Sequence, residues 1–145
     1  MAEINHLVGI RAPIGRIYTA LSTTEGLSRW WTVDVRGSAS VGGTIQFRFA
    51  EQGGPDMLVT ELTPSSSVKW KCTAHTEKEW LGTEVGFALR EEGGQTLLRF
   101  RHSGWKEASD FLAFCSTKWA IFLLSLKEYL ETGAGRPFPY DRRAT

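Results

Sequence analysis

The sequence predicts a single α+β domain in which a long C-terminal helix closes over a curved antiparallel sheet. The 145 residues, 41% of them hydrophobic and 23% charged, suit one hydrophobic core. Hydrophobic residues alternate with polar ones from Val33 to Trp105, as expected for strands with one buried face. A helical period then runs from Lys106 to Glu131. We therefore expect residues 1–145 to form one domain.

The N-terminal segment predicts one strand followed by two short helices. Alternate residues of Ile4–Ile10 are apolar or aromatic, which favours a strand with a partly buried face. Pro13 fits the first turn of a short amphipathic helix, because proline fixes φ and lacks an N–H. Ser22–Glu25 matches a capping box for a second helix, which ends near Trp30 and Trp31.

The middle segment predicts about six further strands, giving a sheet of about seven. Paired glycines at 42–43, 53–54 and 93–94 suit tight hairpins, because glycine accepts positive φ. Met57–Leu62 is strand-like, but its alternation does not identify the inner face. The residues expected on the buried face of the sheet are Ile45, Phe47, Phe49, Val68, Trp70, Cys72, Ala74, Leu81, Val85, Phe87, Leu89, Leu98, Phe100 and His102.

The C-terminal helix carries a broad apolar stripe from Phe111 to Leu130. Gly133 and Pro137 mark its end, since glycine accepts the left-handed conformation and proline cannot continue the helix. The chain also contains eight Phe and six Trp, which is a large aromatic content for one core. Bulky rings on the helix and on a twisted sheet can leave a cavity between the two surfaces.

Charge and hydropathy exclude several classes of partner. A net charge of +1 removes the electrostatic attraction that dominates nucleic-acid binding. Arg142 and Arg143 form the one basic pair after the helix, and we expect them to be solvated. The longest apolar run, Trp119–Leu124, is too short to cross a bilayer, and the N-terminus does not resemble a secretory signal. We therefore expect a cytoplasmic protein with no membrane span.

No cofactor or metal site is predicted. His6, His75 and His102 fall in separate strands without an adjacent set of ligands. Cys72 and Cys115 match no metal or redox spacing, so we expect reduced, buried thiols. Motifs of serine hydrolases and P-loop proteins are absent, and no residue is assigned a catalytic role.

Short runs along nearly the whole chain resemble the START-like superfamily, also called SRPBCC. They are Ile10-Arg11-Ala12-Pro13, Trp30-Trp31, Gly42-Gly43-Thr44-Ile45-Gln46-Phe47, Gly82-Thr83-Glu84-Val85, Phe87, His102-Ser103-Gly104-Trp105, Trp119, Leu123, Leu126-Lys127, Tyr129-Leu130-Glu131 and Gly133. Within the superfamily, the chain is similar to the C-terminal domain of activators of the heat-shock-chaperone ATPase. The resemblance implies a helix-grip fold, in which the sheet wraps around the long helix and a hydrophobic ligand cavity lies between them.

The predicted ligand-binding residues are aromatic or lie on inward faces. Trp30 and Trp31 are expected at the mouth of the cavity, because indole combines an apolar body with one N–H donor. The expected lining is Phe47, Phe49, Trp70, Phe87, Phe100, His102, Phe111, Cys115, Trp119 and Phe122. The alternative for each lining residue is simple core packing, and the alternative for Trp30 and Trp31 is that one packs in the core and the other covers a helix end.

Three functions remain open. The first is binding of a small apolar or aromatic molecule, which the aromatic lining favours. The second is a cyclase or aromatase reaction, in which His102 or an acid such as Glu61, Glu84 or Asp110 moves a proton. For His102 the alternative is a core histidine hydrogen-bonded to backbone. The third, implied by the resemblance, is a co-chaperone that contacts a heat-shock chaperone. A homodimer is also possible.

Overall fold

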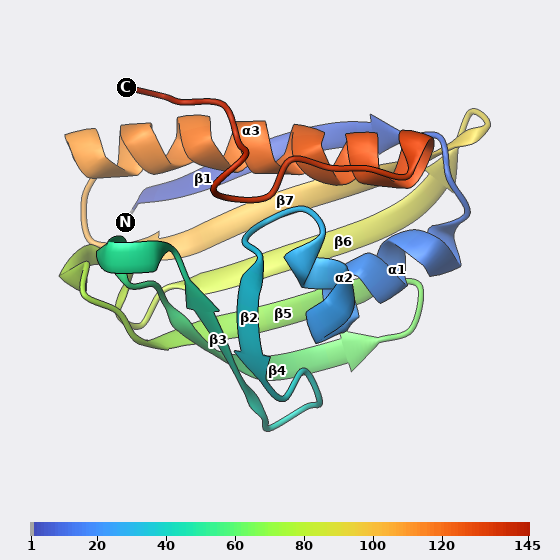
Figure 1. Cartoon of the computed structure of the whole chain (residues 1–145). Helices are drawn as coiled ribbons and strands as arrows, with labels where there is room; N and C mark the ends of the chain where they lie inside the picture. The colour runs from blue at the N-terminus through green and yellow to red at the C-terminus, as the bar shows by residue number, and fades with distance from the viewer. Residues whose placement is uncertain (1) are drawn as a thin grey trace.

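The fold is a seven-stranded antiparallel sheet bent around one long helix, as the sequence predicts. A computed structural model describes residues 2–145 (Figure 1). The strand order is β1-β7-β6-β5-β4-β3-β2, and this is the helix-grip arrangement. The elements are β1 (Ala2–Ile10), α1 (Ile14–Ser22), α2 (Thr24–Ser28), β2 (Asp34–Gly37), β3 (Thr44–Arg48), the 3₁₀ turn η1 (Ala50–Gln52), β4 (Asp56–Thr63), β5 (Ser67–Ala74), the 3₁₀ turn η2 (Lys78–Trp80), β6 (Glu84–Glu92), β7 (Gln95–Trp105) and α3 (Asp110–Thr132).

The helix α3 packs along β1, and α1 contacts α3 near its C-terminal end, while α2 lies against α1 and β2 (Figure 1). Trp119 of α3 meets Phe100 of β7 with ring centroids 4.5 Å apart. On β5, Val68, Trp70 and Cys72 are at most 1% exposed, so the predicted period-two alternation is confirmed there. No helix within residues 2–145 has the length and apolarity required to cross a bilayer.

A bulge explains why the alternation of β4 is ambiguous in the sequence. The pairing of β4 with β5 shifts between Val59 and Glu61. Met57 and Val59 are buried before the shift, and Leu62 packs against the core after it. The extra residue changes which positions face inward, as β-bulges do. A single period-two pattern therefore cannot fit the strand.

The second short helix begins at a different cap from the one predicted. The side chain of Thr23 accepts a hydrogen bond from the Gly26 N–H at 3.0 Å, so Thr23 is the N-cap instead of Ser22. Glu25 lies 3.6 Å from Arg29 and forms an exposed ion pair one helical turn away. The predicted capping box is therefore wrong by one residue.

The long helix starts at Asp110 instead of Lys106. The Ser109 hydroxyl accepts a hydrogen bond from the Leu112 N–H at 3.1 Å and caps the first turn there. The end is as predicted, because Gly133 adopts the left-handed conformation with φ 93°.

Two residues assigned to the buried face of the sheet lie outside it. Ala74 is exposed at the end of β5. Leu81 follows η2 and is 45% exposed, because β6 begins only at Glu84. The turn at η2 instead buries Trp80 and Thr83, which brings an indole beside α3.

Candidate functional site

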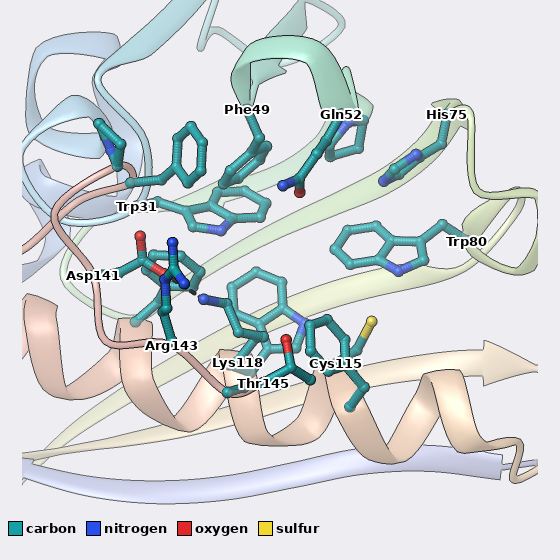
Figure 2. A pocket seen from close by; sticks show the side chains of 17 residues that line it. Trp31, Phe49, Gln52, His75, Trp80, Cys115, Lys118, Asp141, Arg143 and Thr145 are labelled. Carbon is teal, nitrogen blue, oxygen red and sulfur yellow. Dashed lines mark hydrogen bonds and ion pairs between the residues drawn. The ribbon is translucent and has the colours of Figure 1, made fainter.

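A pocket of about 500 Å³ lies between α3, the turns η1 and η2, and the segment that follows α3 (Figure 2). Irregular segments supply much of its wall, and strands of the sheet supply little. Its lining consists of Trp31, Phe49, Gln52, Pro55, His75, Trp80, Phe114, Cys115, Lys118, Trp119, Phe122, Phe138, Pro139, Asp141, Arg143, Ala144 and Thr145. The lining thus combines aromatic rings with a small set of polar and charged groups.

Trp31 is the centre of the aromatic wall. Its ring centroid lies 4.7 Å from that of Trp119 and 5.7 Å from that of Phe49. Phe49 in turn meets Phe138 at 5.3 Å in an edge-to-face arrangement. Contacts between tilted and edge-to-face rings are the favourable geometries for aromatic side chains. These rings form a rigid, apolar surface on which a flat or extended molecule can lie.

The segment after α3 turns back along the helix and covers part of the pocket (Figure 1). The Arg136 N–H donates to the hydroxyl of buried Ser125 at 2.7 Å. Phe138 then forms a short parallel bridge with Thr32. The Phe138 N–H donates to the Trp31 carbonyl at 2.8 Å. These bonds fix the position of the aromatic ring of Phe138 beside the pocket.

An ion pair holds the end of this segment to α3. Lys118 pairs with Asp141, and their side chains are only 23% and 7% exposed. The Lys118 ammonium also donates to the Arg142 carbonyl at 3.3 Å and lies 5.0 Å from the centre of the Phe122 ring. Arg142 and Arg143 are both exposed, as the sequence predicts, and Arg143 also lines the pocket.

His75 and Trp80 form another side of the pocket (Figure 2). Burial, followed by the positive charge of Arg48, lowers the pKa of His75 to about 4. Its Nδ1 atom accepts a hydrogen bond from the Glu77 N–H at 2.9 Å. The imidazole is therefore neutral at physiological pH and contributes no charge to the pocket.

Cys115 lies on α3 near Trp80. Burial raises the pKa of its thiol to about 11, although the nearby Trp80 N–H lowers it in part. The contact does not reach hydrogen-bond geometry, and the buried Trp80 N–H has no hydrogen-bond partner within residues 2–145. A thiol with a raised pKa is a weak nucleophile, because the thiolate is the reactive form. Cys115 therefore contributes apolar surface.

His102 does not line the pocket. The Trp119 indole donates to Nδ1 at 3.1 Å, so the neutral ring carries its proton on Nε2. Nε2 lies 2.8 Å from the Thr83 hydroxyl, which itself donates to the Trp80 carbonyl at 2.6 Å. Burial, and then His75, lower the pKa of His102 to about 3. Both nitrogens are hydrogen-bonded and the ring is fully buried, so the structure favours the alternative of a core histidine over proton transfer. The hydrogen-bond partners of His102 are the side chains of Thr83 and Trp119, whereas the sequence analysis expected backbone groups.

The model of the family described as Activator of Hsp90 ATPase homolog 1-like protein matches residues 11–131. The chain belongs to this family. The match confirms the resemblance to the START-like superfamily and to its chaperone-activator branch. A comparison with curated proteins found no match.

Three solved structures illustrate what this family member is similar to. The solution structure of the Aha1 dimer from Colwellia psychrerythraea has 51% identity and a TM-score of 0.85, and the alignment covers 93% of this chain and 100% of that one. Protein BH1534 from Bacillus halodurans has 25% identity and a TM-score of 0.73, with 90% and 98% covered. CalU16 from Micromonospora echinospora has 23% identity and a TM-score of 0.73, with 94% and 77% covered, and this likeness shows the fold alone.

The structure separates the twelve predicted ligand-binding residues of this chain into two groups. Trp31, Phe49, Cys115, Trp119 and Phe122 line the pocket. Trp30, Phe47, Trp70, Phe87, Phe100, His102 and Phe111 do not. Trp30 is fully buried and donates to the Ala20 carbonyl at 3.0 Å, so it cannot stand at the mouth of a cavity. Phe111 instead packs on Trp105, with ring centroids 6.2 Å apart.

The predicted acids also lie elsewhere. None of Glu61, Glu84 and Asp110 is part of the pocket wall. Glu61 accepts a hydrogen bond from Ser67 at 2.6 Å, and Asp110 occupies the first turn of α3. Within residues 2–145, no group of three or more His, Cys, Asp and Glu side chains could hold a metal ion.

Sequence reasoning missed the polar residues of the pocket and the segment after α3. The missed residues include Gln52, His75, Trp80, Lys118, Phe138, Asp141 and Arg143. Two signals could have indicated part of this set. Trp80 is an indole among charged loop residues, and Phe138 lies between Pro137 and Pro139 after the helix has ended. Both are large apolar side chains that a polar loop would leave exposed unless they pack onto the core.

Proposed function

We propose that this protein binds a small apolar or aromatic molecule in the pocket between α3 and the segment that follows it. The observation that carries the proposal is the aromatic wall around a space of about 500 Å³. A concave pocket of this size, with an aromatic wall and several polar groups directed at the same space, is typical of small-molecule sites. A ligand that buries roughly 200 Å² of apolar surface there would gain about 5 kcal/mol before the costs of binding.

Native mass spectrometry of the gently purified protein tests for a retained ligand, and calorimetric titration with 2-naphthamide tests the empty pocket. The Phe49→Ala variant removes one aromatic wall, so we expect about tenfold weaker binding, the factor that corresponds to one lost aromatic contact. Leu124→Ala is the matched control, because Leu124 is 57% exposed on α3 and does not line the pocket. No binding by the wild type, or an equal loss in both variants, would contradict the proposal.

Retention is favoured over catalysis, because none of the described lining residues combines a free titratable group with a pKa suited to proton transfer at neutral pH. His102 lies outside the pocket, and His75 has a pKa of about 4, far from the value that general acid–base chemistry needs at neutral pH. Asp141 is already paired with Lys118. A cyclase that uses the pocket would therefore depend on positioning the substrate and not on a proton shuttle.

A second function is proposed from the family match: stimulation of the ATPase of an Hsp90-type chaperone, with the protein acting as a homodimer. The support is the family model over residues 11–131 and the 51% identity with a protein described as an Aha1 dimer. An ATPase assay with the purified chaperone from the same organism tests the first part. Light scattering at several concentrations tests the second. An unchanged ATPase rate at saturation, or a monomer mass throughout, would contradict the respective part.

A further inference from the structure

The charged groups of the pocket gather toward one end, beside the segment after α3. Figure 2 shows Lys118, Asp141 and Arg143 together on one side, while His75 and Trp80 lie on the other. The aromatic wall, including Trp31, occupies the space between these ends. The pocket therefore has an apolar body and one charged end, which is the shape of a site for a molecule with two chemically different parts.

The charged end carries one positive charge without a partner. Lys118 is neutralised by Asp141, whose side chain is 7% exposed, and it also donates to the Arg142 carbonyl. Arg143 forms no ion pair and no hydrogen bond with any of the described residues 2–145. The pKa of His75, about 4, leaves that ring uncharged at neutral pH. The guanidinium of Arg143 is thus the charge available to a ligand.

Among the described side chains that line the pocket, no carboxylate is left free to pair with Arg143. Glu77 and Glu79 act on Cys115 at the far side, but neither lines the pocket, and Glu79 accepts a hydrogen bond from Ser109. Gln52 adds a neutral amide to the wall. Asp141 is the one carboxylate side chain among the lining residues described, and Lys118 already occupies it.

We infer that the ligand is an amphiphilic acid, with a flat or extended apolar body and one carboxylate or similar anionic oxygen group. The inference rests on the proposed binding function. The body lies against the aromatic wall, and the anionic group lies at Arg143. A planar guanidinium suits this role, since its fork of N–H donors matches two carboxylate oxygens. The Lys118–Asp141 pair positions Arg143 by holding its segment against α3.

Calorimetric titration with two pairs of matched compounds tests the inference. The pairs are 2-naphthoate with 2-naphthamide, and octanoate with octanamide, so that each acid has a neutral partner of nearly equal size. We expect each acid to bind about tenfold more tightly than its amide, the factor that one charge-assisted hydrogen-bonded contact supplies. Added salt should reduce this preference, because the site is partly open to solvent.

Two substitutions test whether Arg143 causes the preference for acids over amides. Arg143→Gln removes the free charge and should abolish the preference for the acids while the amides bind as before. Arg142→Gln is the matched control. It removes the same charge at the neighbouring position, where the arginine side chain does not line the pocket. Equal affinity for acids and amides, or an equal effect of both substitutions, would overturn the inference while leaving apolar binding intact. If none of the four compounds binds the wild type, the proposed function and this inference both fail.

Discussion

The interior of the molecule has two halves that are built from the same residue types but differ in what covers them. The first half, enclosed by the sheet, contains Trp30, Trp70, Phe87 and Phe100, each at most 1% exposed. The second half faces η1, η2 and the segment after α3, and it leaves a pocket. Regular strands bring side chains together at fixed spacing, so the rings interdigitate. The turns and the segment after α3 have no such regular spacing, and their charged side chains do not interdigitate with the rings, so a pocket remains.

Trp119 connects the two halves. Its ring packs on Phe100 and lines the pocket, while its N–H donates to His102. The polar network of His102 and Thr83 therefore fixes the orientation of one pocket wall from behind. Aromatic content therefore predicts a buried interior but does not predict where that interior is open.

The largest expected effect lies in the enclosed half. Phe87 contacts Trp30, Trp70 and Phe100 and is 1% exposed, so Phe87→Ala should lower the free energy of unfolding by about 3–5 kcal/mol. Phe49→Ala, the pocket counterpart, should lower it by less than about 2 kcal/mol, because that ring is only partly buried and already faces open space. Urea denaturation measures both values. Equal losses would remove the distinction between the halves.

His102→Ala should be nearly as damaging, although no ligand contact is lost. The substitution leaves the buried Trp119 N–H without its acceptor, removes the hydrogen bond between His102 and the Thr83 hydroxyl, and opens a small cavity, so we expect a loss of about 2–4 kcal/mol. Urea denaturation gives the loss, and calorimetry should show weaker ligand binding through Trp119. A variant as stable as the wild type would show that the network is dispensable.

Stability should fall as the pH is lowered from about 6.5 toward 4. An unfolded histidine binds a proton near pH 6.5, but the folded-state pKa is about 3 for His102 and about 4 for His75. The unfolded state therefore takes up protons that the folded state does not, and folding becomes less favourable. Above pH 6.5 neither group contributes. His102→Gln should make the slope of unfolding free energy against pH shallower, and an unchanged slope would argue against the assignment.

The smallest expected effect concerns the ion pair that holds the segment after α3. Lys118→Met leaves the Asp141 carboxylate, 7% exposed, without its partner, so we expect a loss of about 1–2 kcal/mol. Asp141→Asn leaves the more exposed Lys118 side chain and should cost less, about 0.5–1 kcal/mol. Thermal unfolding ranks the two variants. A larger loss of stability for Asp141→Asn than for Lys118→Met would show that the burial of Asp141 does not determine the stability of the ion pair.

The fold and the inward faces of most strands could be predicted because they depend on local periodicity. Val68, Trp70 and Cys72 alternate as expected, and Gly133 ends the helix as expected. The bulge in β4 could not be predicted, since an extra residue shifts the phase without leaving a mark in composition. The alternation of residues in the sequence does not predict the inner face of β4, because the pairing of β4 with β5 decides which residues face inward.

The pocket was predicted only in part for a related reason. Its aromatic wall lies on surfaces that the sequence identifies as inward, as for Trp119 and Phe122. Its charged end depends on Lys118 meeting Asp141, two residues separated by the end of a helix and a returning segment. No spacing rule relates such residues. Trp30 and Trp31 are both buried, but only Trp31 lines the pocket. Which inward side chain reaches the pocket depends on three-dimensional packing and cannot be derived from the spacing of apolar residues.

We propose that the half of the interior beside the segment after α3 binds a ligand and that the half enclosed by the sheet does not, and the six tryptophans report on both halves. Trp31, Trp80 and Trp119 line the pocket, whereas Trp30, Trp70 and Trp105 do not. The most direct measurement is the ¹H–¹⁵N spectrum of the indole N–H groups during titration with 2-naphthoate and 2-naphthamide. We predict that the resonances of the three pocket tryptophans move and that the other three remain in place. Six unmoved resonances, or larger shifts for Trp30, Trp70 and Trp105, would contradict the account.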